Sequence, residues 1–264
     1  KNFETRVING RKLNIKANTE TSIRIYANES VEIITGVEKV KNVQLLNNSG
    51  TITSLVGNGS NKVVVKDTIA IDVADDLAEI MKVDFKIVDS ETKISYNKVL
   101  SKAEAVIEIM YLTEDNRINT VATRIPRMGF VDIQDVNETC NCEVQNNLSN
   151  LIIKPNNTEE HSIYVEAEIE VVCSAYENKD INIIEDLYSM TEDIQFTKKD
   201  IKAVTERNRI SDICIVKENI RIPELTGRVL NVQINPTINN QQVRKGKVLY
   251  EGNLNLEIMF EQNN

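Results

Sequence analysis

Histidine is the side chain that most often transfers protons near neutral pH, and the sequence contains one, His161. A hydrolase with a Ser–His–Asp or Cys–His arrangement would have to use it. His161 follows Glu159 and Glu160 in the segment EEHSIY, at the start of a strand-like run, and no nucleophile motif accompanies it. The alternative is a solvent-exposed histidine beside acidic neighbours, which we favour. We therefore predict that the chain has no catalytic residue and is not an enzyme.

Cys140 and Cys142 are the second group that could do chemistry, because with His161 and Cys173 they would supply four metal ligands. Zinc-binding cysteines usually come in pairs with two to four residues between them, whereas one residue separates Cys140 from Cys142. Cys173 and Cys214 occupy positions that hold Ile or Val in an internal repeat described below, which is typical of small core side chains. We therefore predict no metal site. Four cysteines are also too few for a disulfide scaffold, so a reducing interior is expected.

Two further segments suggest binding chemistry at first sight. The run VGNGSNK at residues 56–62 resembles a phosphate-binding loop, but it lacks the GxxxxGK[ST] order and is followed by three valines typical of a strand. We predict an ordinary loop there and no cofactor. Glu166, Glu168 and Glu170 alternate with apolar residues, which predicts a solvated sheet face that also discourages edge-to-edge pairing. Recognition of a basic partner is the alternative interpretation of these glutamates.

Composition excludes several classes of partner. The net charge of −9 is spread along the chain without a basic run that could neutralise a phosphate backbone, so we expect no nucleic acid and no anionic membrane surface as partner. No apolar stretch approaches the roughly 18 residues of a spanning helix, so we predict no membrane insertion. Tryptophan is absent and aromatic residues make up 5%, which leaves little material for stacking against sugars or bases.

An internal repeat organises the elements that would position these residues. The stretch NKVLSKAEAVIEIMY at Asn97–Tyr111 recurs as GKVLYEGNLNLEIMF at Gly246–Phe260, and both ends give the same separation of 149 positions (246 − 97 and 260 − 111). In each copy alternate residues are apolar, which predicts a strand with one buried face. A period of this length indicates a whole small domain copied in tandem. We predict two domains, residues 1–133 and 134–264.

Other segments show the same period of two. Asn9-Gly10 predicts a hairpin turn within RVINGRKLNIKA, and further strands are expected at residues 22–34, 125–133, 148–153 and 165–173. Short helical turns are expected at Ala74–Met81 and Lys198–Thr205. The predicted fold is therefore all-β, with two tandem, similar, antiparallel sandwich-like domains and these helical turns. Because both copies are clipped within the repeat, the first at its N-terminal end and the second at its C-terminal end, we expect the chain to be a piece of a longer tandem protein or to have degenerate outer repeats.

The repeated pattern resembles a known family. The hairpin RVINGRKLNIKA, the segments VVVKDTI and IVKENI, the repeated stretch and the trailing TRIPRMGFVDI resemble the SPOCS domain of clostridial spore coat and morphogenetic proteins (SipL-like). The resemblance covers nearly the whole chain. It implies a non-enzymatic protein that helps to assemble the shell around the developing spore. The implied location is the mother-cell cytoplasm at the forespore surface, in the spore coat or an outer spore layer.

The resemblance also implies partners. These are other spore-envelope proteins, among them a coat ATPase of the SpoIVA kind, and a second copy of the chain in a homo-oligomer. SipL-like proteins carry a C-terminal LysM domain implicated in the ATPase contact, and no such domain follows Phe260. The SPOCS-like repeats are therefore expected to act as a spacer, a self-association unit or a second binding surface. Which residues form the interaction surface stays open.

A different class of function is a β-sandwich module that binds a surface glycan or peptidoglycan. Such a module needs exposed aromatic side chains on a concave face. The candidates are Tyr26, Tyr96, Tyr164, Tyr176 and Tyr250. A hydrolase that uses His161 is the third class.

Overall fold

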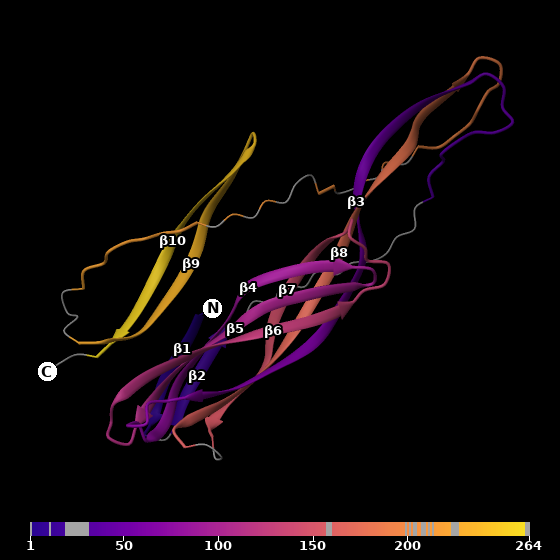
Figure 1. Cartoon of the computed structure of the whole chain (residues 1–264). Coiled ribbons are helices and arrows are strands. Elements are labelled where there is room, and N and C mark those ends of the chain that lie inside the picture. Colours follow the sequence, from indigo (N-terminus) through magenta and orange to yellow (C-terminus); the bar gives the residue numbers. More distant parts are fainter. Residues whose placement is uncertain are drawn as a thin grey trace. The chain divides into compact units, whose positions relative to one another are not determined.

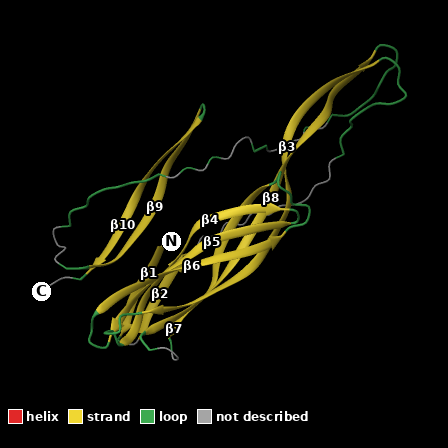
Figure 2. Cartoon of the chain, viewed as in Figure 1, coloured by secondary structure: helices red, strands yellow, loops and turns green. Residues whose placement is uncertain are grey.

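The computed structural model describes residues 2–10, 12–18, 32–156, 160–198, 200, 202, 205–206, 210, 212, 214–222 and 227–261. The described residues form ten β-strands and no helix (Figures 1 and 2). The strands are β1 (Asn2–Asn9), β2 (Lys12–Asn18), β3 (Val43–Ala70), β4 (Leu77–Ser95), β5 (Lys98–Thr113), β6 (Ile118–Asp132), β7 (Asn141–Pro155), β8 (Ser162–Ser189), β9 (Val229–Arg244) and β10 (Lys247–Phe260). Consecutive strands in the hairpins pair antiparallel. The predicted all-β fold class is confirmed.

The chain divides into two compact units. The first comprises residues 1–49 and 182–197, and it contains the β1–β2 hairpin and the outer ends of β3 and β8. The second comprises residues 50–181 and 198–264 and contains the remaining strands. Among the described residues, every buried hydrophobic side chain lies in the second unit, so the packing of that unit determines where the side chains considered above are held.

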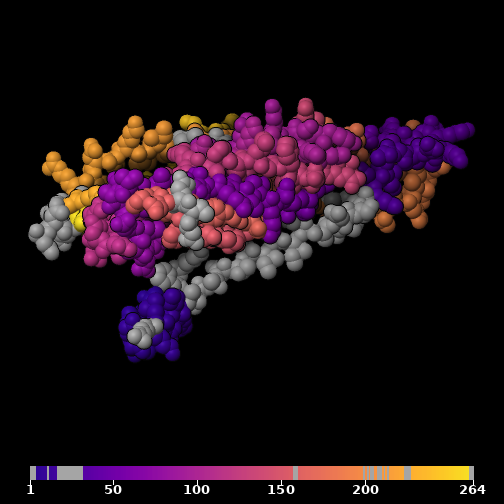
Figure 3. Space-filling view, turned by 60° about the horizontal axis from the view of Figure 1, so that its bottom comes forward, coloured from indigo at the N-terminus to yellow at the C-terminus, as the bar shows by residue number. Residues whose placement is uncertain are grey.

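The core of the second unit is a β-sandwich. The sheets β4-β5-β6 and β3-β8-β7 cover each other's apolar faces, and Figure 3 shows the side chains of these strands, coloured purple to salmon, in close contact. The central strands supply the inward residues: Ile107 and Ile109 of β5 and Ile163 and Val165 of β8 are fully buried. Burial of each such side chain stabilises the fold by about 1.5–3 kcal/mol. The predicted strands over residues 125–133, 148–153 and 165–173 are confirmed as parts of β6, β7 and β8.

The repeated stretch forms equivalent hairpins. It is β5 in the first copy and β10 in the second, and each is the second strand of an antiparallel pair. Ile107 of β5 pairs with Phe85 of β4, and Leu256 of β10, at the equivalent position, pairs with Ile234 of β9, which is the counterpart of Phe85. The hairpins β4–β5 and β9–β10 therefore share both alternation and register. The prediction that the repeated stretch is a strand is confirmed.

The turns of the two hairpins also correspond. Asn97 and Gly246 end the turns before β5 and β10, with φ angles of 57° and 73°. Asparagine and glycine tolerate this left-handed conformation best. The sheet β3-β8-β7, however, joins strands from both sides of the boundary predicted between residues 133 and 134, so one core draws on both sequence repeats. The division into domains 1–133 and 134–264 stays a prediction, and β1–β2 and β9–β10 each form a separate two-stranded sheet.

Some predictions of local structure are wrong. Ala74–Met81 forms no helical turn, because a hydrogen-bonded turn closes at Asp75 and β4 begins at Leu77. The segment 56–62 is no loop but the interior of β3. A Cβ atom on Gly59 would lie 2.8 Å from the carbonyl oxygen of Asp132, so glycine here permits close approach of two chain segments rather than a turn.

Two predicted elements fall partly on residues that the structure does not describe. Of the strand expected at residues 22–34, residues 22–31 lie outside the described chain, and residues 32–34 have no regular structure, so the strand prediction is wrong there. Of the helical turn expected at Lys198–Thr205, residues 198, 200, 202 and 205 are described and carry no helix. The RVINGRKLNIKA hairpin is confirmed as β1–β2.

Candidate functional site

The loop between β3 and β4 holds a buried carboxylate. Asp75 is 1% exposed, and its Oδ2 accepts hydrogen bonds from the Tyr111 hydroxyl at 2.7 Å and the Asn119 amide at 2.6 Å. Its Oδ1 lies 3.1 Å from Nη1 of Arg117. The antiparallel register places Tyr111 of β5 directly opposite Asn119 of β6, which is why both reach the same oxygen. We call Asp75, Tyr111, Arg117 and Asn119 the Asp75 cluster.

The Asp75 cluster fixes the charge of its members. The hydrogen bond from Tyr111 holds the pKa of Asp75 below its usual range, with further lowering by Asn119 and Arg117, and together they outweigh the opposing effect of burial. Burial, aided by the bond to Asp75, raises the pKa of Tyr111. At neutral pH the carboxylate is thus ionised, with two hydrogen bonds to Oδ2 and an ion pair at Oδ1, while the phenol keeps its proton. Neither group is suited to transfer a proton, and the cluster ties the β3–β4 loop to the ends of β5 and β6.

His161 lies beside this cluster, at the turn that enters β8. Its Nδ1 is 3.1 Å from the backbone carbonyl oxygen of Asp75, and its own carbonyl oxygen accepts a hydrogen bond from the amide of Ile71 at 2.8 Å. The ring is half-buried, so the predicted solvent-exposed histidine is wrong in that respect, because the β3–β4 loop packs against it. A cavity of about 520 Å³ adjoins the ring and is also lined by Asp76 and Glu160. The Nδ1 contact with a carbonyl gives His161 a positioning role in the fold.

The cysteines do not gather around His161. Cys173, near the middle of β8, is fully buried and lies near Cys142 of β7, while His161 precedes the first residue of β8, twelve residues or about 40 Å of strand away. Burial, with a smaller effect of Cys142, raises the pKa of Cys173 to about 12. Cys140 is buried and Cys214 exposed, and none of the four cysteines forms a disulfide. Within the described ranges no three metal-ligating side chains come together.

The acidic face of β8 is paired with lysines. Glu166 lies 3.0 Å from Lys66, and Glu168 lies 2.8 Å from Lys62, both of which belong to the neighbouring strand β3. These hydrogen bonds raise the pKa values of both lysines, and the pKa of Glu166 is lowered, first by a hydrogen bond from the Tyr164 hydroxyl. β8 is the central strand of its sheet, so the glutamates do not protect an edge as predicted. They form a partly neutralised outer sheet face.

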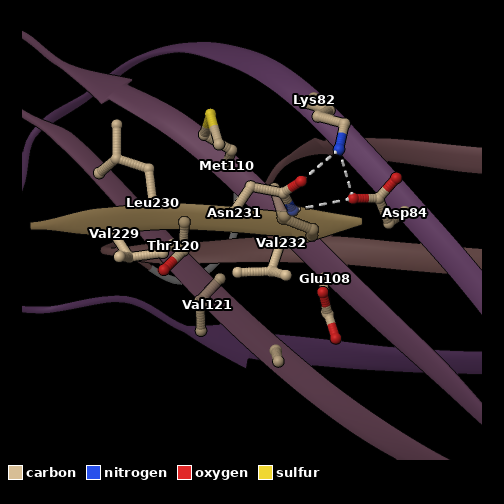
Figure 4. A pocket seen from close by; sticks show the side chains of 12 residues that line it. Lys82, Asp84, Glu108, Met110, Thr120, Val121, Val229, Leu230, Asn231 and Val232 are labelled. Carbon is tan, nitrogen blue, oxygen red and sulfur yellow. Dashed lines mark hydrogen bonds and ion pairs between the residues drawn. The ribbon is translucent and has the colours of Figure 1, made fainter. Parts of the chain in front are cut away.

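A shallow cleft of about 400 Å³ lies between the outer face of β4-β5-β6 and the start of β9 (Figure 4). Lys82 donates to Asp84 at 2.7 Å and to the side-chain oxygen of Asn231 at 2.8 Å. Asn231 and Gln233 donate to the Asp84 oxygens at 3.1 and 3.3 Å. Burial raises the pKa of Asp84, but these donors outweigh it and the net pKa is lowered. The polar groups of the cleft therefore bind one another and hold β9 against β4.

The tyrosines proposed for glycan binding do not form one platform. Tyr26 lies outside the described residues, and Tyr96 and Tyr250 are exposed on different hairpins. Tyr164 and Tyr176 both belong to β8 but are twelve residues apart, or about 40 Å along the strand. A sugar ring spans far less than that distance, so the described tyrosines offer separate contacts at most.

A buried cation is a feature that the sequence analysis missed. Arg127 of β6 is 3% exposed in the sandwich interior, where Nη2 donates to Ser101 Oγ at 3.2 Å and to the side-chain oxygen of Asn146. Its Nε and Nη1 have no hydrogen-bond partner among the described residues. Burial lowers the pKa of Arg127. The signal that could have revealed it is the period of two in β6, which places Arg127 inward together with Ile125.

Comparison with known protein families gives a match over part of the chain. A family model described as "SipL, SPOCS domain" matches residues 76–156. The match runs from the residue before β4 to the residue after β7, and the resemblance inferred from sequence is confirmed over this segment. A SPOCS domain indicates a protein related to sporulation.

No curated protein and no solved structure matches the chain. In the described part of the chain, no helix has the length and apolar character needed to cross a membrane.

Proposed function

We propose that this chain is a non-enzymatic structural module of the bacterial spore envelope that acts through protein–protein contacts in the coat or a neighbouring outer layer. The match of residues 76–156 to the SPOCS domain carries the proposal, because these residues build one sheet of the sandwich and part of the other. The geometry supports it. The titratable groups that could serve catalysis, Asp75, Tyr111 and His161, are held in contacts within the fold.

Exposed apolar surface supports a role in contacts between proteins. Ile234 of β9 is 57% exposed, and Leu254 and Leu256 of β10 are 48% and 40% exposed. Contiguous apolar surface of this kind is typical of interaction sites. We propose other spore-envelope proteins as the partners, with a SpoIVA-like coat ATPase among them. The proposed location is the forespore surface on the mother-cell side.

Localisation in a sporulating host tests the proposed function. A fluorescent fusion of the chain should collect as a cap or ring around the forespore and remain with the coat fraction of the purified spore. Ile107→Asp, which places a carboxylate in the core, should abolish this pattern, whereas Lys102→Asp on the exposed face of the same strand should preserve it. Diffuse fluorescence of the unaltered chain throughout sporulation, with no protein in the coat fraction, would refute the proposal.

A further inference from the structure

The equivalent hairpins β4–β5 and β9–β10 differ in one respect, which is the covering of their apolar faces. Ile107 and Ile109 of β5 are fully buried under the sheet β3-β8-β7. Their counterparts in β10 are Leu256, which is 40% exposed, and Ile258, which is partly exposed. The same apolar pattern in the same register is therefore a core in one hairpin and an open surface in the other.

The open face of β9–β10 is one continuous side of the hairpin. Cross-strand pairs on it join Leu256 to Ile234 and Leu254 to Pro236. The opposite side carries Asn231 and Gln233, which bond to Asp84 across the cleft shown in Figure 4. The polar side is thus bonded within the chain, whereas Ile234, Leu254 and Leu256 on the apolar side stay exposed. Leaving these apolar side chains in contact with water costs free energy, which is recovered when another surface covers them.

The chain itself shows what kind of surface covers such a face. Within the sandwich, Ile163 and Val165 of β8 pack over the β4–β5 hairpin and are fully buried. A shift of 150 positions along the repeat places Leu13 and Ile15 of β2 at the same sites. Both are exposed, at 53% and 62%.

The β1–β2 hairpin is also paired antiparallel like β7–β8, with its register shifted by two residues, which keeps the same side chains on the same face. Ile15 of β2 pairs with Thr5 of β1, and Val165 of β8 pairs with Ile153 of β7. Val7, which pairs with Leu13, is 73% exposed. The β1–β2 hairpin is therefore the counterpart of a covering layer, with the covering side chains left open.

A third segment completes the correspondence. Val65 and Ile69 of β3, the strand next to β8, are both 6% exposed. Their counterparts in the second repeat, Val216 and Ile220, are 55% and 56% exposed and belong to no strand. The hairpins β4–β5 and β7–β8 and part of β3 thus each have a second copy in this chain, and in these copies the side chains that correspond to the core are exposed.

We propose that the apolar face of β9–β10 binds the β1–β2 hairpin of a second copy of this chain, in the way that β7–β8 covers β4–β5 within the sandwich. The two surfaces differ, and every chain carries one of each. Such a contact is head-to-tail, so it extends into a filament or closes into a ring rather than ending at a dimer. The inference deepens the proposed assembly function and rests on it for its biological meaning.

Measurement of molar mass tests this contact. Sedimentation velocity of the purified chain of 264 residues should show a mass that rises with concentration from 29.9 kDa to multiples beyond a dimer. Leu256→Glu on β10 and Ile15→Glu on β2 should each keep the chain monomeric at 29.9 kDa, even at ten times the concentration at which wild type assembles. The matched controls are Met259→Glu and Asn14→Glu, which place the same charge on the opposite faces of the same strands. Both controls should assemble like wild type.

Mixing the two blocked variants identifies the partner surfaces. The Leu256→Glu chain keeps an intact β1–β2 hairpin and the Ile15→Glu chain keeps an intact β9–β10 face, so an equimolar mixture should form a dimer of one copy of each and stop there. The proposal is wrong if wild type stays monomeric at all concentrations, if Ile15→Glu still self-associates, or if the mixture does not dimerise. Because these residues are exposed, circular dichroism melting of each variant should match wild type, which separates lost contact from lost folding.

This test uses only the purified chain, so its result is independent of the localisation experiment. A chain that self-associates but stays diffuse in sporulating cells would refute the proposed function and leave this contact standing. A chain that is monomeric in solution but collects at the forespore would refute this contact alone.

Discussion

Tyr111→Phe should isolate the contribution of the Asp75 cluster, because phenylalanine occupies the equivalent position of the second repeat as Phe260. The change removes the hydroxyl that donates to Asp75 at 2.7 Å and keeps the ring in the core. A hydrogen bond to a charged group contributes about 1.5–3 kcal/mol. For a unit of this size 1 kcal/mol shifts the melting temperature by about 2–4 °C, so the variant should melt about 3–12 °C lower at pH 7.

The pH dependence provides a second measurement. The pKa of Asp75 is lowered in the folded protein from its ordinary value of 3.8, so this group adds stability that is present above the unfolded pKa and lost as pH falls through the folded pKa. The Tyr111 hydrogen bond is the main cause of that lowering. The difference between wild type and Tyr111→Phe should therefore be largest near pH 7 and shrink as pH falls from the ordinary value toward the lowered pKa of Asp75 in folded wild type.

Circular dichroism melts and urea unfolding at pH 7, 5 and 3 measure this difference. Tyr96→Phe is the matched control, since the Tyr96 side chain is 74% exposed at the β4–β5 turn and its variant should stay within about 0.5 kcal/mol of wild type. Equal melting of the two variants at pH 7 would refute the argument. So would a loss of stability in Tyr111→Phe that is the same at pH 3 as at pH 7.

Three further variants or reactions test other parts of the structure. Ile107→Asp should destabilise the sandwich by more than about 4 kcal/mol, whereas Leu256→Asp, at the equivalent but exposed position, should leave its melting temperature unchanged. Arg127→Met should raise the free energy of unfolding by about 1–3 kcal/mol, seen as a higher urea midpoint, because two of its buried nitrogens have no partner among the described residues. Cys214 should react with iodoacetamide at pH 8 well before Cys173, whose thiol is buried with a pKa raised to about 12, and peptide mass spectrometry reports the order.

Strands with one buried face were predictable from the sequence because burial leaves a period of two. The alternation in β5 and β8 identified both strands and their inward residues. The loop predicted at residues 56–62 was wrong because the sequence shows that glycines are present there but does not show whether a glycine forms a turn or allows two chain segments to approach closely. At Gly59 the reason is the carbonyl oxygen of Asp132, which belongs to a distant part of the chain.

The Asp75 cluster was not predictable from local patterns. Tyr111 and Asn119 meet at Asp75 because the turn between β5 and β6 sets their register. In that turn the amide of Thr113 donates to the carbonyl oxygen of Arg117, and the amide of Arg117 donates to the Thr113 hydroxyl. Alternation predicts which face of each strand is apolar, but it does not predict which residues stand opposite each other. A polar cluster that depends on strand register therefore cannot be predicted from the sequence until the position of the hairpin turn is known.

The repeat shows that the apolar pattern of a strand does not by itself determine whether another layer covers that strand. Ile107 and Leu256 are both large aliphatic side chains, both lie in strands of alternating apolar residues, and both have the same cross-strand register. Ile107 is nevertheless fully buried, whereas Leu256 is 40% exposed. The difference comes from the layer that covers the face and not from the strand itself. Where a sequence repeats its core pattern but the described chain assembles the core once, the open copies are the surfaces at which contact with another protein gains the most apolar burial. In this chain those surfaces are the β1–β2 and β9–β10 hairpins, and their complementarity can be inferred because the sandwich contains the corresponding hairpins β7–β8 and β4–β5 already packed together.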